Sequence, residues 1–125
     1  MKRIVFAAAM KACWNQVKNE LREASFEIDM CTDADQVVEK VLKTPCVGLF
    51  IDQHLPYGQT FSKQETNYGT VTGEVVARYL LERQPALPIV LLATPGYTPN
   101  ASEKVTVLNI LDLLPSKALE LARKF

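Results

Sequence analysis

The sequence predicts an α/β protein with a doubly wound, mostly parallel five-stranded sheet and helices on both of its faces. Short apolar runs alternate along the chain with segments of helical periodicity, as in parallel sheets joined by crossover helices. Two of the runs, 47–51 and 87–93, carry no charged or hydrogen-bonding side chain, which is typical of strands buried on both faces. The 125 residues, 48% of them hydrophobic, predict a single domain over 1–125.

The first three elements are a strand, a helix and a strand. Residues 3–8 form a short, mainly apolar run without a period, which predicts a buried strand. Between 13 and 25 apolar residues recur at helical spacing with charged residues between them, so this segment predicts an amphipathic helix. Residues 26–31 alternate apolar and polar side chains, which predicts a half-exposed strand at an edge of the sheet.

The same alternation continues through the second helix and the third strand. Thr32 and Asp33 are N-cap candidates for an amphipathic helix. The helix is expected to end before Pro45, because the residue before a proline disfavours helical geometry. The third strand then covers Val47–Asp52 and ends on a carboxylate.

A third helix and a fourth strand complete the regular part of the pattern. Thr72 is expected to cap the helix and Pro85 to end it, and residues 87–93 predict another buried strand. The alternating strand belongs at an edge and the continuous strands in the middle. Together with right-handed crossovers, this placement predicts the flavodoxin-like strand order 2-1-3-4-5.

The C-terminal third allows two assignments. A fifth strand at 105–110 suits the β-branched residues there, but 95–104 is then short for a parallel crossover, which needs roughly a dozen residues. The alternative begins a short helix at Asn100, where a capping-box pattern starts, and moves the strand to 109–114. We prefer the second assignment. In both cases the last helix follows Pro115.

Asp52 lies where this fold binds its ligands. Ligands of an open parallel sheet bind beyond the carboxyl ends of the strands, where the strand order reverses. In the predicted order that place is beside the first and third strands. Asp52 is therefore either a functional carboxylate or a polar end-cap or remnant, hydrogen-bonded to loop amides or to Lys117.

Four segments, in order, resemble the receiver domains of bacterial two-component response regulators. They match the phosphoacceptor motif, the helix after it, the strand that carries the family's switch hydroxyl and, faintly, the loop that holds its lysine. They read Asp-Gln-His-Leu-Pro (52–56), Gly-Glu to Leu (73–80), Leu-Pro-Ile-Val-Leu-Leu-Ala-Thr (87–94) and Leu-Pro-Ser-Lys (114–117). The resemblance covers residues 2–94 and extends weakly to the rest.

The resemblance implies roles for three polar residues. Asp52 takes the phosphoacceptor position, and Thr94 and Lys117 are switch-like positions. Ala93 falls at the family's hydroxyl position, with Thr94 one residue later. A shift of one residue turns a side chain to the other face of a strand.

The family's acidic pair at the end of the first strand is replaced by Ala8 and Ala9. In the family this pair holds magnesium together with the phosphoacceptor. Magnesium needs oxygen ligands, and Asp52 alone supplies one carboxylate. Without the cation, charge on a transferring phosphoryl group lacks its main stabiliser. The sequence therefore predicts a degenerate receiver without a metal site, independent of phosphorylation.

The segment 57–72 is longer than the few residues that link these elements in the family. It is polar and carries Tyr57, Phe61 and Tyr68. Loops of this length without regular structure are usually functional or disordered. We expect a mobile interaction loop with exposed aromatic residues; the alternative is a tolerated insertion, which costs little closure entropy.

Composition excludes several classes of function. Lysine plus arginine balance aspartate plus glutamate at 14 each, so no global field attracts nucleic acid or a membrane surface. No glycine-rich phosphate loop is present, and we expect no cofactor. Three widely spaced cysteines and the lone His54 predict reduced thiols, a cytoplasmic location and no metal.

These observations predict a non-enzymatic regulatory module. Its partner is a protein or a downstream output domain, and a homodimer is a further option. Two alternatives stay open. One is an active receiver that accepts phosphate on Asp52. The other is a receiver-like, non-catalytic N-terminal domain of a larger enzyme such as a basic amino-acid decarboxylase, which shares this fold type.

Overall fold

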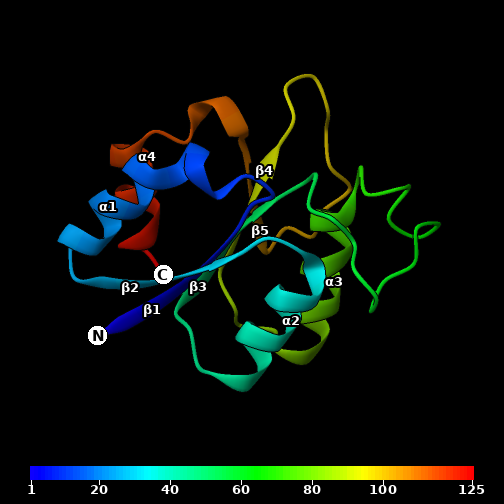
Figure 1. The fold of residues 1–125 in the computed structure, drawn as a ribbon, viewed down its shortest axis with the longest axis horizontal. Coiled ribbons are helices and arrows are strands. Elements are labelled where there is room, and N and C mark those ends of the chain that lie inside the picture. The colour runs from blue at the N-terminus through cyan, green and yellow to red at the C-terminus, as the bar shows by residue number, and fades with distance from the viewer.

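A five-stranded sheet between two layers of helices makes up the fold, and the computed structural model describes residues 1–125 (Figure 1). The strands are β1 (Lys2–Ala7), β2 (Phe26–Cys31), β3 (Gly48–Asp52), β4 (Ile89–Ala93) and β5 (Val105–Asn109). They pair in the order β2-β1-β3-β4-β5, and every neighbouring pair is parallel. The predicted strand order, with the alternating strand at an edge, is confirmed.

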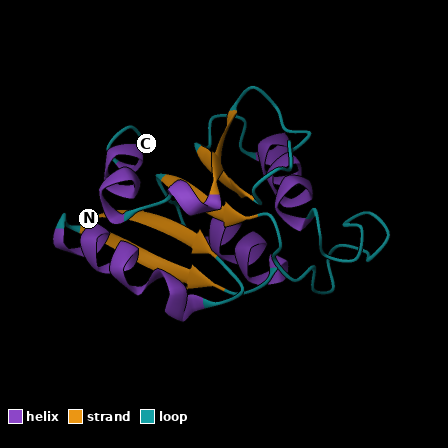
Figure 2. Ribbon diagram, turned by 90° about the horizontal axis from the view of Figure 1, so that it is seen from above, coloured by secondary structure: helices purple, strands orange, loops and turns teal.

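Helices cover both faces of this sheet, as the view from above in Figure 2 shows. They are η1 (Lys11–Trp14), α1 (Asn15–Glu23), α2 (Ala34–Lys43), α3 (Thr72–Arg83), η2 (Ile110–Asp112) and α4 (Pro115–Ala122), of which η1 and η2 are 3-10 turns. The helices α2 and α3 pack on one face, and α1 and α4 pack on the other. None of these helices has both the length and the apolar character needed to span a bilayer.

Alternate residues of the central strands enter two separate cores. In β1, Val5 belongs to the core under α2 and α3, whereas Ile4 and Phe6 belong to the core under α1 and α4. In β3, Leu49 and Phe50 divide in the same way. Each of these five side chains is at most 1% exposed. Burial on both faces explains why the central strands are apolar without a period.

One predicted helix cap is present and the other is wrong. The Asp33 carboxylate accepts a hydrogen bond from the Gln36 amide at 2.9 Å and caps α2. No side chain caps α3, and its first turn packs against the end of β3. There the Gly73 amide donates to the Gln53 carbonyl at 3.1 Å, and a Cβ on Gly73 would meet the Asp52 carbonyl oxygen at 2.6 Å. Thr72 is buried at this junction instead of capping it.

The preferred assignment of the C-terminal third is wrong. The fifth strand is Val105–Asn109 and not 109–114, and no helix begins at Asn100. Residues 94–104 cross from β4 to β5 without a helix. Two turns are closed by backbone hydrogen bonds, from the Tyr97 amide to the Thr94 carbonyl and from the Val105 amide to the Ser102 carbonyl. The β-branched residues at 105–107, which favour strand geometry, lie in the observed strand. The crossover length did not require a helix, because an irregular connection bridges two adjacent strands in fewer residues.

Candidate functional site

Asp52 ends β3 at the carboxyl edge of the sheet and is half-buried. Its Oδ1 accepts a hydrogen bond from the His54 amide at 3.0 Å. Burial raises the pKa of this carboxyl above its usual range, and the His54 amide partly offsets the rise. Lys117 is not its partner, because the Lys117 ammonium pairs with Glu120 on α4 at 3.4 Å. Asp52 thus holds the turn that follows β3.

The end of β1 brings no carboxylate to this edge. The register pairs Ala7 with Ile51, so Ala8 is the next residue, level with Asp52. Ala8 is fully buried and Ala9 is exposed. No group of three Asp, Glu, His or Cys side chains lies close enough together to hold a metal ion. Magnesium prefers an octahedral set of oxygen ligands, and the residues present at this edge do not fit one.

The two switch-like positions lie on different elements and have different partners. Thr94 is the first residue after β4, and its backbone amide donates to Gln53 Oε1 at 2.9 Å. Beside it β5 ends on Asn109, which is paired with Ala93. Lys117 lies eight residues further along the chain, within α4. The end of β5 therefore offers an amide at this edge and not an ammonium group.

Gln53 organises the edge and was not anticipated from the sequence. It is 3% exposed, and both ends of its amide are bonded. Its Nε2 donates to the Thr70 carbonyl at 3.1 Å, and its Oε1 accepts from the Thr94 amide at 2.9 Å. This one side chain joins the start of α3 to the end of β4. The only signal in the sequence was a polar residue that directly follows an apolar strand.

The segment 57–71 is tied to α2 by one carboxylate. The Asp35 oxygens accept from the amides of Gln59 at 2.7 Å and Thr60 at 2.8 Å, and these hydrogen bonds lower the pKa of Asp35. Gly58 makes this approach possible. It has a φ of +68°, and a Cβ there would lie 2.5 Å from an Asp35 oxygen.

The expectation that all three loop aromatics are exposed is wrong for Phe61. Phe61 is 6% exposed, belongs to the core under α2 and α3, and meets Tyr79 edge-on at 5.2 Å between ring centroids. Tyr57 is half-buried against the same core. Tyr68 is 71% exposed and has a φ of +57°. The loop projects from the body of the protein in Figures 1 and 2, but it is anchored at Phe61.

Sequence comparison gives no relative for this chain. No protein-family model matches it, and no curated protein matches it either.

Solved structures, in contrast, match over nearly the whole chain. The chemotaxis response regulator CheY4 of Vibrio cholerae aligns with a TM-score of 0.73 at 15% identity, over 99% of this chain and 98% of its own. The response regulator TrrA of Thermotoga maritima, solved with Mg²⁺ and BeF, aligns with 0.69 at 23% identity, over 97% and 99%. A receiver protein from Sinorhizobium medicae aligns with 0.73 at 16% identity, over 98% and 92%. At these identities the likeness establishes the architecture: this chain has the receiver fold.

Proposed function

We propose that this chain is a regulatory module of the receiver type that binds a protein partner or an output domain without accepting phosphate. The observation that carries the proposal is Ala8 beside Asp52, where the site holds a single carboxylate. The structure of TrrA was solved with Mg²⁺ and BeF. The corresponding edge of this chain has no second carboxylate to share such a cation.

The chemistry of phosphoryl transfer supports this assignment. The transferring group carries negative charge that a cation neutralises, and catalysis rests on that electrostatic stabilisation and on positioning. Asp52 is half-buried with a raised pKa and has no lysine beside it. A second negative charge on that side chain would therefore meet an environment that already disfavours the first.

The test is a phosphorylation assay with a matched gain-of-site control. The protein is incubated with acetyl phosphate and magnesium, and its intact mass is measured. We expect no adduct for the natural chain and partial recovery of magnesium binding in the double variant Ala8→Asp, Ala9→Asp. A stoichiometric adduct on the natural chain that disappears in Asp52→Asn would establish the active receiver instead.

The second part of the proposal is that the loop 57–71 binds the protein partner. Tyr68 is an exposed aromatic in left-handed backbone geometry, and such strained positions concentrate at functional sites. A photo-crosslinking benzoylphenylalanine is placed at position 68 and, as control, at the exposed Asn19 on α1. We expect a discrete crosslinked protein from position 68 only, and the same product in an Asp52→Asn background. Equal products from both positions would place the binding surface elsewhere.

A further inference from the structure

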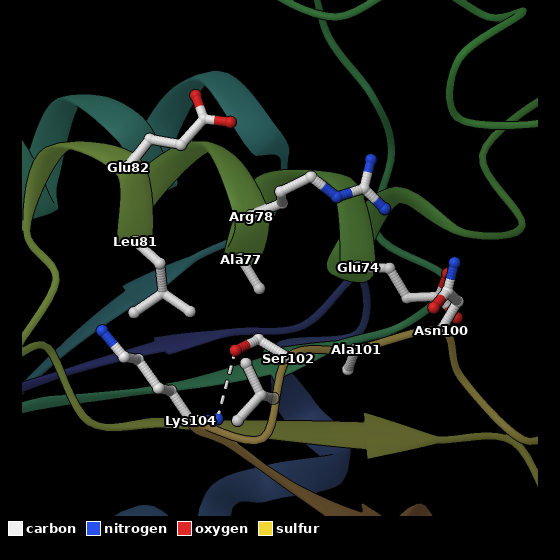
Figure 3. A pocket seen from close by; sticks show the side chains of 10 residues that line it. Glu74, Ala77, Arg78, Leu81, Glu82, Asn100, Ala101, Ser102 and Lys104 are labelled. Atoms are coloured by element: carbon white, nitrogen blue, oxygen red, sulfur yellow. Dashed lines mark hydrogen bonds between the residues drawn. The ribbon is translucent and has the colours of Figure 1, made fainter.

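A groove of about 580 Å³ lies between α3 and the bare crossover 94–104 (Figure 3). The β1–β2, β2–β3 and β3–β4 crossovers each carry a helix, and the β4–β5 crossover carries none. The flank of α3 that a fourth crossover helix would cover is open for this reason. The groove is thus a direct product of the topology, and Asp52 is not among the residues that line it.

The floor of the groove is apolar. Ala77 and Leu81 contribute from α3, and Ala101 and Val105 contribute from the crossover and from β5. Ala77 is 2% exposed and Val105 is 8% exposed, so both belong to the core beneath. A ligand that lies along this floor meets carbon and not water-binding groups.

One end of the groove holds a buried carboxylate with an unused oxygen. Glu74 is 7% exposed, and its Oε1 has no hydrogen-bond partner. Figure 3 shows the side chain extending from α3 toward Asn100, among the residues that line the groove. The nearby Glu74 carboxylate raises the pKa of the Tyr97 hydroxyl. Glu74 Oε1 itself has no hydrogen-bond partner. A buried polar oxygen without a partner carries a desolvation cost that an incoming donor removes.

No cation of the chain satisfies Glu74. The Lys104 ammonium, at the other end of the groove, donates to the Pro85 carbonyl at 3.4 Å. Arg78 lies one turn along α3 and makes no hydrogen bond to Glu74 Oε1. On the rim, Glu82 pairs with Arg83, at 3.8 Å. Glu74 Oε1 is therefore an unpaired acceptor at the wall of the groove, and it is itself shielded from solvent, so a donor meets it when the side chain turns toward the groove.

We propose that this groove binds an organic monocation, with an ammonium or guanidinium group on Glu74 and an apolar body along the floor formed by Ala77 and Val105. The volume lies in the range of small-molecule sites, about 300–1,000 Å³. Ten residues line the groove, whereas a standard protein interface engages roughly 20–30 residues a side. The size of the groove thus favours a small ligand over a docked protein.

Phenethylamine is a suitable probe, because it joins one ammonium to one apolar ring. Amide chemical shifts of the full chain are followed while the probe is added. We expect saturable shifts confined to residues 74–82 and 97–105. The neutral analogue 2-phenylethanol should bind at least about tenfold more weakly, since a charge-assisted hydrogen bond is roughly twice as strong as a neutral one.

Two matched carboxylate variants distinguish binding at Glu74 from nonspecific attraction of a cation to negative charge. Glu74→Gln should weaken phenethylamine at least about tenfold, and Glu82→Gln, which removes a charge on the rim, should change it less than about twofold. Glu74→Gln should also melt no lower than the natural chain, because it removes a buried charge without shrinking the side chain. Should Glu74→Gln fail to fold, Ala101→Phe blocks the groove from its exposed side and serves the same comparison.

Several results would overturn the proposal. These are absence of shifts at about 10 mM phenethylamine, equal binding of the alcohol, or shifts centred on Asp52. A fourth is binding of an arginine-bearing helical peptide without any binding of phenethylamine, which would make the groove a protein-docking surface.

Discussion

At the scale of single residues, the Asp52 carboxyl sets a pH dependence of stability. Its pKa is raised in the folded chain, so the folded state holds its proton to higher pH than the unfolded state does. Stability contributed by this group is therefore lost as pH rises from the ordinary value of 3.8 through the raised value. We expect Asp52→Asn to be more stable than the natural chain above this window and equal to it below. Urea unfolding of both proteins across acidic and neutral pH measures the difference; a constant difference would contradict burial as its cause.

Gln53 carries a larger stability effect than its polar character suggests. Gln53→Leu leaves the Thr94 amide and the Thr70 carbonyl without their partner. We expect a loss of about 1–3 kcal/mol in the free energy of unfolding, because the half-buried Thr94 amide loses its partner, whereas the carbonyl of the exposed Thr70 can bond to water. Hydrogen exchange at the Thr94 amide should accelerate in parallel. Gln64→Leu, on the exposed part of the loop, is the control and should change stability by less than about 0.5 kcal/mol.

Alanine substitutions at two glycines distinguish the cost of backbone strain from the cost of a steric clash. Gly58 and Gly96 have φ of +68° and +81°, but only at Gly58 would a Cβ strike another group, the Asp35 carboxylate. Gly96→Ala should cost about 1–2 kcal/mol from backbone strain alone. Gly58→Ala should cost more and should return the pKa of Asp35 toward its ordinary value, because the loop amides are pushed away. Carboxyl NMR titration reports this change; equal effects of the two substitutions would show that the Asp35 contact does not constrain the loop.

At the scale of elements, the loop 57–71 divides into an anchor and an exposed end. Phe61→Ala removes a ring from the core under α2 and α3 and should cost about 3–5 kcal/mol. Tyr68→Ala removes an exposed ring and should change stability by less than about 0.5 kcal/mol. Urea unfolding compares the two. A small effect of Phe61→Ala on stability would indicate that the segment is a tolerated insertion without a structural anchor.

The elements also show which patterns in the sequence were informative. Periodicity and polarity identified β1 to β4, and β2 was recognised as an edge strand because it alternates. The sequence misplaces β5, because the expected length of a parallel crossover favours a later strand over the β-branched residues at 105–107. Phe61 was expected to be exposed because a loop gives no periodicity that distinguishes an anchor from a surface ring.

The sequence predicts only those site residues whose positions follow from the end of a single strand. Asp52 and Ala8 could be placed from strand ends and the expected strand order. Gln53 could not, because its burial results from Thr70 and Thr94, which lie far away in sequence and come together only in the fold. Glu74 was missed for the same reason, since the groove beside it exists only because residues 94–104 form no helix.

At the scale of the whole molecule, β5 is expected to open before the rest of the sheet. It pairs only with β4, and apart from Val105 its residues are half-buried or exposed. Regions with few buried contacts exchange their amide hydrogens through local opening. We expect β5 amides to exchange at least about a hundredfold faster than those of β3. Exchange of both strands at one common rate would show that the sheet opens only as a unit.

The bare crossover 94–104 also leaves the molecule open to redesign. It begins and ends on strands that the sheet already holds in register, and a Cβ on Gly96 would meet nothing within 4 Å. A helix grafted between Thr94 and Lys104 would enter the open space beside α3. The β4–β5 crossover would then carry a helix, as the other three crossovers do. The chain is thus a receiver scaffold with one vacant position, into which a helical epitope or a reporter peptide could be spliced while the termini stay where they are.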